Sequence, residues 1–178
     1  MGIESYNFIV FPKNNHTSLT EDGWEIIGTS LISFKKITEY LLSFKNITNY
    51  EPENMASYAS KDCYYNYVDE TSIIEFEINY GDKVDFIQEI SARFAVCNGN
   101  GTYEKFISIC KSLNRDLNLE TLDMKFGEIL DFDDELQILR SKNTYEKKKK
   151  QFYRFFKLPN DSISRPVHCG KAVFDLLL

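Results

Sequence analysis

The sequence has no run of apolar residues approaching the roughly 18 that a membrane-spanning helix needs, so we do not expect a transmembrane protein. It also has no basic stretch ahead of an apolar segment near residue 1, which argues against a signal peptide and favours the cytoplasm. Its 4 prolines and 8 glycines form no linker. We therefore predict one domain over residues 1–178, in which residues 158–178 form a C-terminal extension or an edge strand.

Cysteine and histidine are scarce. No two of the four cysteines form a C-x-x-C pair, and only two histidines are present to complete a metal site. This spacing argues against a zinc centre, and the expected cytoplasmic location argues against a disulfide framework. We expect no metal, no cofactor and buried cysteines that behave as small apolar side chains. The residues concerned are Cys63, Cys97, Cys110, Cys169, His16 and His168.

No catalytic motif stands out, which places an enzyme second among our hypotheses. Glu75 and Glu77 are two residues apart in a strand-like segment and would share one face, as a pair of acid–base carboxylates must. The same alternation also describes the solvent face of a half-buried strand. A second candidate is a nucleophilic Cys169 with His16 as its base, which requires the fold to bring distant segments together.

Positive charge is in deficit, because 21 Lys and Arg stand against 27 Asp and Glu, for a net charge of −6 and a pI of about 5.0. This balance disfavours nucleic acid as the main partner, since phosphate contacts need a basic surface. The two signs are segregated: residues 116–135 contain eight acids and one base, and residues 140–157 contain eight bases and one acid. The sequence leaves open whether these two blocks pair with each other.

The densest acidic segment contains Asp131, Asp133, Asp134 and Glu135. It lacks the glycine and the spacing of an EF-hand loop, so it does not indicate a calcium site. A local acidic surface suits a basic protein, because complementary charge steers two molecules together. Tyr65 lies in a tyrosine-rich stretch, and tyrosine is enriched at protein interfaces, although a core position would explain it equally well.

We therefore expect a non-enzymatic, cytoplasmic protein-binding module. Its most concrete form is an inhibitor or immunity protein that neutralises a basic bacterial toxin, with Asp131, Asp133, Asp134, Glu135 and Tyr65 as its partner-binding residues. The alternative is a small enzyme with a carboxylate or Cys/His site. A third hypothesis is nucleic-acid binding through the basic, aromatic-rich segment 147–156, for which a helix with an aromatic core face and a solvated basic face is the simpler interpretation.

Hydrophobic periodicity predicts the elements. Alternation indicates strands at residues 3–11, 24–27, 63–68, 73–80 and 122–126, of which 63–68 and 73–80 form a hairpin. Residues 13–23 and 49–60 are expected to be loops. Spacing of three and four residues predicts helices at residues 34–44 with Ser30 or Ser33 as N-cap, 82–97, 102–117, and from Asn143 to just before Pro159.

The resulting order of strands and helices is typical of an α+β fold with a split β-α-β arrangement. We predict an antiparallel or mixed sheet of four to six strands, with the helices packed mainly on one face. Residues 167–178 would add a final strand.

Overall fold

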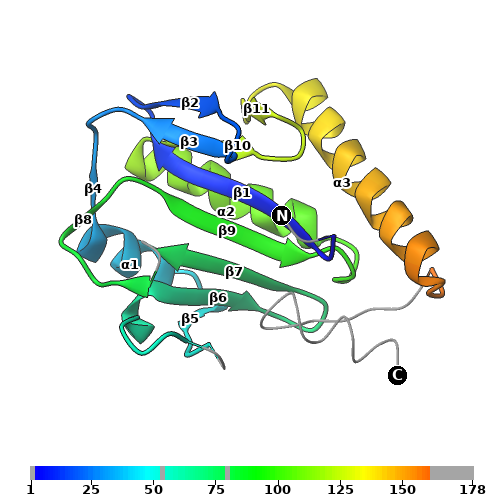
Figure 1. Cartoon of the computed structure of the whole chain (residues 1–178), viewed down its shortest axis with the longest axis horizontal. Helices are drawn as coiled ribbons and strands as arrows, with labels where there is room; N and C mark the ends of the chain where they lie inside the picture. The colour runs from blue at the N-terminus through cyan, green and yellow to red at the C-terminus, as the bar shows by residue number, and fades with distance from the viewer. Residues whose placement is uncertain (1–2, 53–54, 79–80, 161–178) are drawn as a thin grey trace.

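The computed structural model describes residues 3–52, 55–78 and 81–160, and the structural statements below refer to these ranges. A large sheet forms the centre. Its strands are β1 (Ser5–Pro12), β5 (Ile47–Asn49), β6 (Tyr64–Val68), β7 (Ile73–Ile78), β9 (Ile90–Ala95), β10 (Leu119–Asp123) and β11 (Glu128–Ile129). They lie in the order β11-β10-β1-β9-β7-β6-β5, and all neighbouring pairs are antiparallel (Figure 1). The α+β class is confirmed, and the sheet has seven strands rather than four to six.

A split β-α-β unit lies at the middle of this sheet. Both β9 and β10 pair antiparallel with β1, so they run parallel to each other on either side of it. The helix α2 (Thr102–Leu117) connects them and crosses one face of the sheet (Figure 1). The sequence therefore shows a strand, a helix and a strand in succession. The strand that pairs with both β9 and β10 is β1, the first strand of the chain.

All three helices contribute to one hydrophobic core. The helices α1 (Phe34–Leu42) and α3 (Glu135–Phe156) join α2 in a cluster with the inward-facing residues of the sheet. The ring centroids of Phe8 on β1 and Phe106 on α2 are 4.0 Å apart, and Phe94 on β9 contacts Tyr145 on α3 with centroids 5.4 Å apart. The expectation of helices on one face is confirmed.

A β-hairpin covers part of the opposite face. It consists of β2 (His16–Leu19) and β3 (Trp24–Ile27), and its residues Trp24 and Ile26 pack against Ile9, Phe11 and Leu122. The prediction of a loop over residues 13–23 is therefore wrong at β2. Its sequence, HTSL, has no apolar alternation, and it is a strand because β3 supplies the hydrogen-bonding partner.

The predicted helix at residues 82–97 does not exist. This segment contains β8 (Phe86–Ile87), which pairs with β4 (Ile32–Ser33), and then β9. Ile87, Ile90 and Phe94 have helical spacing, but Ile90 and Phe94 also alternate with Ser91 and Arg93. A strand is the outcome because β9 lies between β1 and β7 and pairs with both. The short 3₁₀ helix η1 (Lys61–Cys63) leads into β6.

The last helix begins nine residues earlier than the capping signal at Asn143 predicted. Asp134 is its N-cap, and the side chain accepts hydrogen bonds from the amides of Leu136 and Gln137. The other expected helices are confirmed, with Ser33 as the N-cap of α1. None of the helices in the ranges above is long and apolar enough to cross a membrane. The strand expected at residues 167–178 lies outside those ranges.

We expect Phe106→Ala to lower the free energy of unfolding by about 3–5 kcal/mol, because Phe106 is fully buried and its ring contacts Phe8, Phe76 and Phe94. Urea denaturation measures the change. Phe155→Ala is the matched control, because Phe155 is 70% exposed on α3 and its removal should cost less than about 0.5 kcal/mol. Equal losses in the two variants would contradict the placement of this core.

Candidate functional site

The two carboxylates of β7 lie on the sheet face opposite the helices, where Glu75 is directly opposite Arg93 of β9. Arg93 Nε donates to Glu75 Oε2 at 2.6 Å, and Arg93 Nη2 lies 3.9 Å from Glu77 Oε2. The side chain of Glu77 is 26% exposed, whereas that of Glu75 is only 2% exposed. The solvent-face interpretation is therefore wrong for Glu75, which belongs to a buried ion pair.

Burial raises the pKa of Glu75 to about 7, although the charge of Arg93 and its hydrogen bond act in the opposite direction. A single guanidinium thus bridges a buried and a half-exposed carboxylate. This geometry connects β7 to β9, and we assign Glu75, Glu77 and Arg93 a structural role in the sheet, in which burial favours the protonated form of Glu75.

The thiols of the described ranges are buried. Burial raises the pKa of Cys63 to about 11 and also raises that of Cys110, so both are poor nucleophiles. This confirms the expectation of cysteines that act as apolar core residues. His16 is exposed on β2. Cys169 lies outside the described residues, so the Cys/His alternative stays a prediction. No group of three or more metal-ligating side chains was found in the described parts of the chain.

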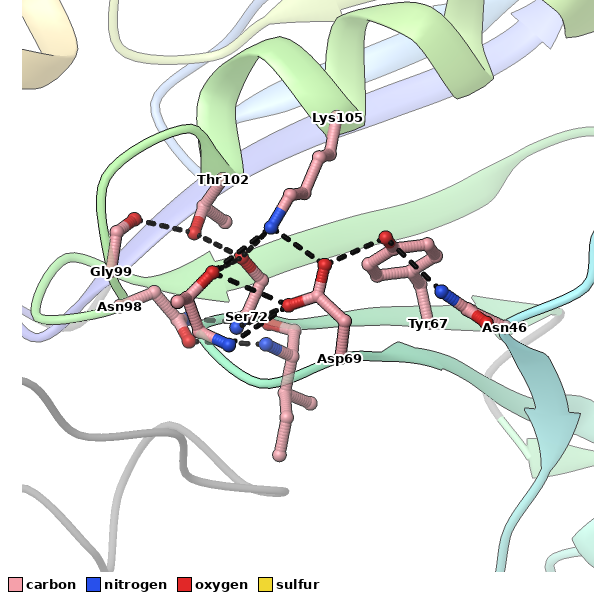
Figure 2. Close-up of polar contacts among 10 residues, drawn as sticks. Asn46, Tyr67, Asp69, Ser72, Asn98, Gly99, Thr102 and Lys105 are labelled. Atoms are coloured by element: carbon pink, nitrogen blue, oxygen red, sulfur yellow. Dashed lines mark hydrogen bonds and ion pairs between the residues drawn. The ribbon is translucent and has the colours of Figure 1, made fainter.

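The most connected polar cluster joins the turn between β6 and β7 to the start of α2 (Figure 2). We call Asp69, Ser72, Asn98, Thr102 and Lys105 the turn clamp. Asp69 Oδ1 accepts hydrogen bonds from the amides of Thr71 and Ser72, both at 2.9 Å. Its Oδ2 lies 2.6 Å from Lys105 Nζ and accepts from the Tyr67 hydroxyl at 2.7 Å. Partial burial opposes ionisation, but these partners bring the pKa of Asp69 well below its usual range.

A lysine beside a serine hydroxyl can indicate a nucleophile and its base, and Lys105 Nζ lies 3.2 Å from Ser72 Oγ. The environment of the pair argues otherwise. Ser72 is fully buried and its hydroxyl lies 2.7 Å from that of Thr102, while Lys105 Nζ forms an ion pair with the carboxylate of Asp69. A substrate has no access to this hydroxyl. The turn clamp therefore connects two segments of the fold.

Close backbone contact reinforces the turn clamp. The amide of Gly99 donates to the carbonyl of Thr71 at 2.7 Å, and a Cβ added to Gly99 would lie 2.6 Å from Thr71 Cβ. Residue 99 therefore has to be glycine for these loops to approach so closely. The glycine-rich segment 98–101 joins β9 to α2, and so it follows a strand rather than the helix that we had predicted.

A second buried cluster surrounds Asp123, which is fully buried although the sequence counts it in the acidic block. The hydroxyl of Tyr6 donates to Asp123 Oδ2 at 2.8 Å, Ser141 donates to the same oxygen, and Tyr103 donates to Ser141 at 2.6 Å. Burial raises the pKa of Asp123, and its hydrogen bonds partly offset this effect. These four side chains come from β10, β1, α3 and α2, so their hydrogen bonds connect the sheet to two helices.

The predicted acidic surface is found at the start of α3. Asp131, Asp133, Asp134 and Glu135 are all exposed, and the side chain of Asp133 is 92% exposed. Asp131 accepts a hydrogen bond from the amide of Asp133 at 2.9 Å, and Asp134 is the helix N-cap. Local hydrogen bonds therefore fix the backbone of this segment while its carboxylates face solvent.

Two leucines border these acids. Leu136 is 69% exposed and Leu139 is 51% exposed, both in the first two turns of α3. We call the set of Asp131, Asp133, Asp134, Glu135, Leu136 and Leu139 the acidic–leucine surface. No sequence signal marks the leucines as exposed, because the capping signal at Asn143 predicts a helix that begins after both of them.

Tyr65 does not belong to this surface. It is 5% exposed and packs in the main core, on the face of β6 that carries the helices. Its proposed contact with a partner is therefore corrected: the alternation of β6 directs Tyr65 inward. Its neighbour Tyr64 faces the other side of the sheet but is only 8% exposed.

Residues of both charge blocks form ion pairs with residues of α2. Lys111 on α2 lies 3.2 Å from Asp133, and Lys142 on α3 pairs with Glu104 on α2. Lys111 and Asp133 also line a shallow depression of about 500 Å³ beside the acidic–leucine surface. The acidic block extends from the end of α2 through β10 and β11 to the first residue of α3, and the basic block lies in α3 up to its C-cap Lys157.

The raised pKa of Glu75 predicts a pH dependence of stability. The folded state binds the proton of Glu75 more tightly than the unfolded state does. Glu75 therefore adds to the free energy of unfolding below pH 4.5, and this contribution is lost as the pH rises to about 7. The free energy of unfolding should therefore fall over this window by at most about 3 kcal/mol, at about 1.4 kcal/mol per pH unit. Urea titrations from pH 4 to 8 should show a steeper fall in the wild type and in Glu77→Gln than in Glu75→Gln, to which buried Asp123 still contributes. A slope unchanged in Glu75→Gln would refute the assignment.

The turn clamp predicts the opposite sign at acid pH. The lowered pKa of Asp69 contributes stability above its usual value of 3.8, and this is lost as the pH falls below that value. We expect Asp69→Asn to cost about 1–3 kcal/mol at pH 7 and progressively less below pH 4. Thermal and urea unfolding provide the measurement. Glu70→Gln, at an exposed neighbouring position, is the control and should be nearly neutral.

The geometry of these clusters gives three polar clusters with structural roles and one exposed surface of mixed acidic and apolar character. Comparison of the chain with protein-family models, with curated proteins and with solved structures finds no match.

Proposed function

We propose that this protein is a non-enzymatic binding module for a basic protein and that the acidic–leucine surface is its contact region. The observation that carries the proposal is the exposure of Leu136 and Leu139 beside four exposed acids on a fixed helix start. Apolar side chains in solvent are unfavourable, and a partner that covers them gains the free energy of their burial.

The two residue types have different roles in association. Exposed carboxylates attract a basic partner over about 8–10 Å at physiological ionic strength, and so they mainly raise the association rate. Leucines at the centre of a contact slow dissociation, because their burial is lost when the complex separates. Asp133 and Glu135 therefore steer the basic partner to the surface, and Leu136 and Leu139 slow its dissociation.

The most concrete form of this function is an inhibitor or immunity protein that neutralises a basic bacterial toxin in the cytoplasm. Such an inhibitor has to bind faster than its target acts, and a net charge of −6 with a local acidic surface favours fast capture. The preformed helix start also favours tight binding, because it does not have to be ordered when the partner arrives.

We expect Asp133→Lys with Glu135→Lys to lower the association rate constant for the partner by at least about tenfold at low salt. The double variant leaves Asp134 in place as the N-cap. Glu21→Lys with Asp22→Lys, in the exposed turn between β2 and β3, is the matched control with the same change in net charge. The partner is isolated by capture from lysate of the native cell at low and high salt, identified by mass spectrometry and purified for biolayer interferometry.

A captured protein that binds with equal rates to the double variant, the control and the wild type would overturn the assignment of this surface. So would a stoichiometric partner that is acidic, or the lack of any protein retained by the wild type at either salt concentration. Leu139→Ser tests the second role: it should speed dissociation while changing the association rate by less than about twofold.

A further inference from the structure

The solvent face of α3 carries a basic stripe that continues the acidic–leucine surface along the same helix. We define this stripe as Lys147, Lys150 and Arg154. Together with Asn143, Glu146 and Gln151 they line an open groove of about 430 Å³. Their spacing of three and four residues places them on one face, and the same face contains Leu136, Leu139 and Asn143 towards the start of the helix.

Other lysines of the basic block have structural partners. The ammonium of Lys148 donates to the carbonyl of Ser5, and that of Lys149 donates to the carbonyl of Asn98 at 2.9 Å. The three residues of the basic stripe make no ion pair with the residues that the structure describes. Their charge therefore remains available on the outer side of α3, which lies at the edge of the molecule (Figure 1).

We propose that two copies of this chain associate through α3 in an antiparallel arrangement, with the basic stripe of each copy on the acidic–leucine surface of the other. The inference rests on the surface assigned under the proposed function and gives it a second occupant, the chain itself. A homodimer of this kind masks the binding surface until a basic protein of higher affinity displaces the second copy.

The positions along the helix fit such a pair. If the two-fold axis passes between residues 144 and 145, Glu135 is opposite Arg154 and Leu139 is opposite Lys150. The part of α3 from residue 135 to residue 154 is about 28 Å long at 1.5 Å per residue. Two-fold symmetry repeats each contact, so both ends of the helix pair join opposite charges. The methylene stems of Lys150 and Arg154 can cover the leucines while their charged groups stay at the edge.

Charge complementarity favours a second copy over nucleic acid as the occupant. The three bases of the stripe share α3 with the acids at its start, and the chain as a whole carries a net charge of −6. A nucleic acid lying along α3 would meet those acids, whereas an antiparallel copy presents bases to them. One helix face from each chain is a small interface, so we expect a weak and salt-sensitive dimer.

Sedimentation of the full chain at concentrations from 10 µM to about 1 mM tests the proposal, using two charge-reversal variants. One replaces Lys147, Lys150 and Arg154 with Glu, and the other is Asp133→Lys with Glu135→Lys. The wild type should dimerise at 20 mM salt and dissociate at 500 mM salt. Each variant alone should be at least about tenfold weaker in self-association, because its α3 surfaces then have like charge. An equimolar mixture of the two should restore association as a heterodimer.

A wild type that is monomeric at every concentration and salt condition would overturn the proposal, as would variants that self-associate like the wild type or a mixture that does not associate. Binding of a fluorescent single-stranded oligonucleotide that depends on the basic stripe, without dimerisation, would assign that stripe to nucleic acid instead. Circular dichroism and urea denaturation verify that both variants are folded.

The same variants separate this inference from the proposed function. Reversal of the basic stripe should abolish the homodimer and leave capture of the basic partner intact, since it does not change the acidic–leucine surface. We therefore expect the basic-stripe variant to lose the homodimer and to keep its binding to the basic partner. We expect this partner binding to depend on Asp133 and Glu135. A partner that binds equally well after reversal at Asp133 and Glu135 would instead overturn the proposed function.

Discussion

The buried carboxylate of Asp123 holds the parts of this fold in their relative positions. It accepts hydrogen bonds from Tyr6 on β1, from Ser141 on α3 and from two backbone amides that follow β10. An ionised carboxylate without partners is too costly to bury, so these donors have to stay in place. The orientation of α3 on the sheet, and with it the position of every exposed side chain on that helix, depends on this cluster.

The turn clamp likewise holds the start of α2 in position relative to the sheet. Asp69 and Lys105 join the hairpin of β6 and β7 to the helix that connects β9 to β10, and Gly99 allows the backbones to approach closely. Together the two clusters attach α2 and α3 to the central strands. Much of the polar chemistry that could have suggested an active site is therefore directed inward, where it stabilises the fold.

The surface on which we base the proposed function is the outer face of α3. Its first turns carry acids and exposed leucines, and its later turns carry exposed bases, so this single helix has opposite charges at its two ends. The arrangement also suits the helix dipole, which favours acids at the N-terminus and bases at the C-terminus. A charge pattern that stabilises the helix is thus also the one that we propose binds basic partners and, in antiparallel orientation, a second copy of the chain.

The amino-acid sequence alone predicts the α+β class, the first strand, the β6–β7 hairpin, α1 with a serine cap at either Ser30 or Ser33, and the extent of α2. These depend on local signals, namely alternation, helical spacing and capping residues, which act over a few positions. It also determined the exposed acids at 131–135, because a dense cluster of charge cannot be buried without partners.

Elements with weak or conflicting local signals depend instead on contacts between segments that are distant in sequence. Residues 90–95 fit a helix or a strand, and pairing with β1 and β7 selected the strand. The partners of Asp123 and Glu75 lie in other elements, so their burial could not be read from alternation. The sequence leaves open whether Tyr65 lies at the surface or in the core, and the register of β6 in the sheet places it in the core. The exposure of Leu136 and Leu139 likewise depends on which face of α3 packs inward, and contacts distant in sequence fix that face.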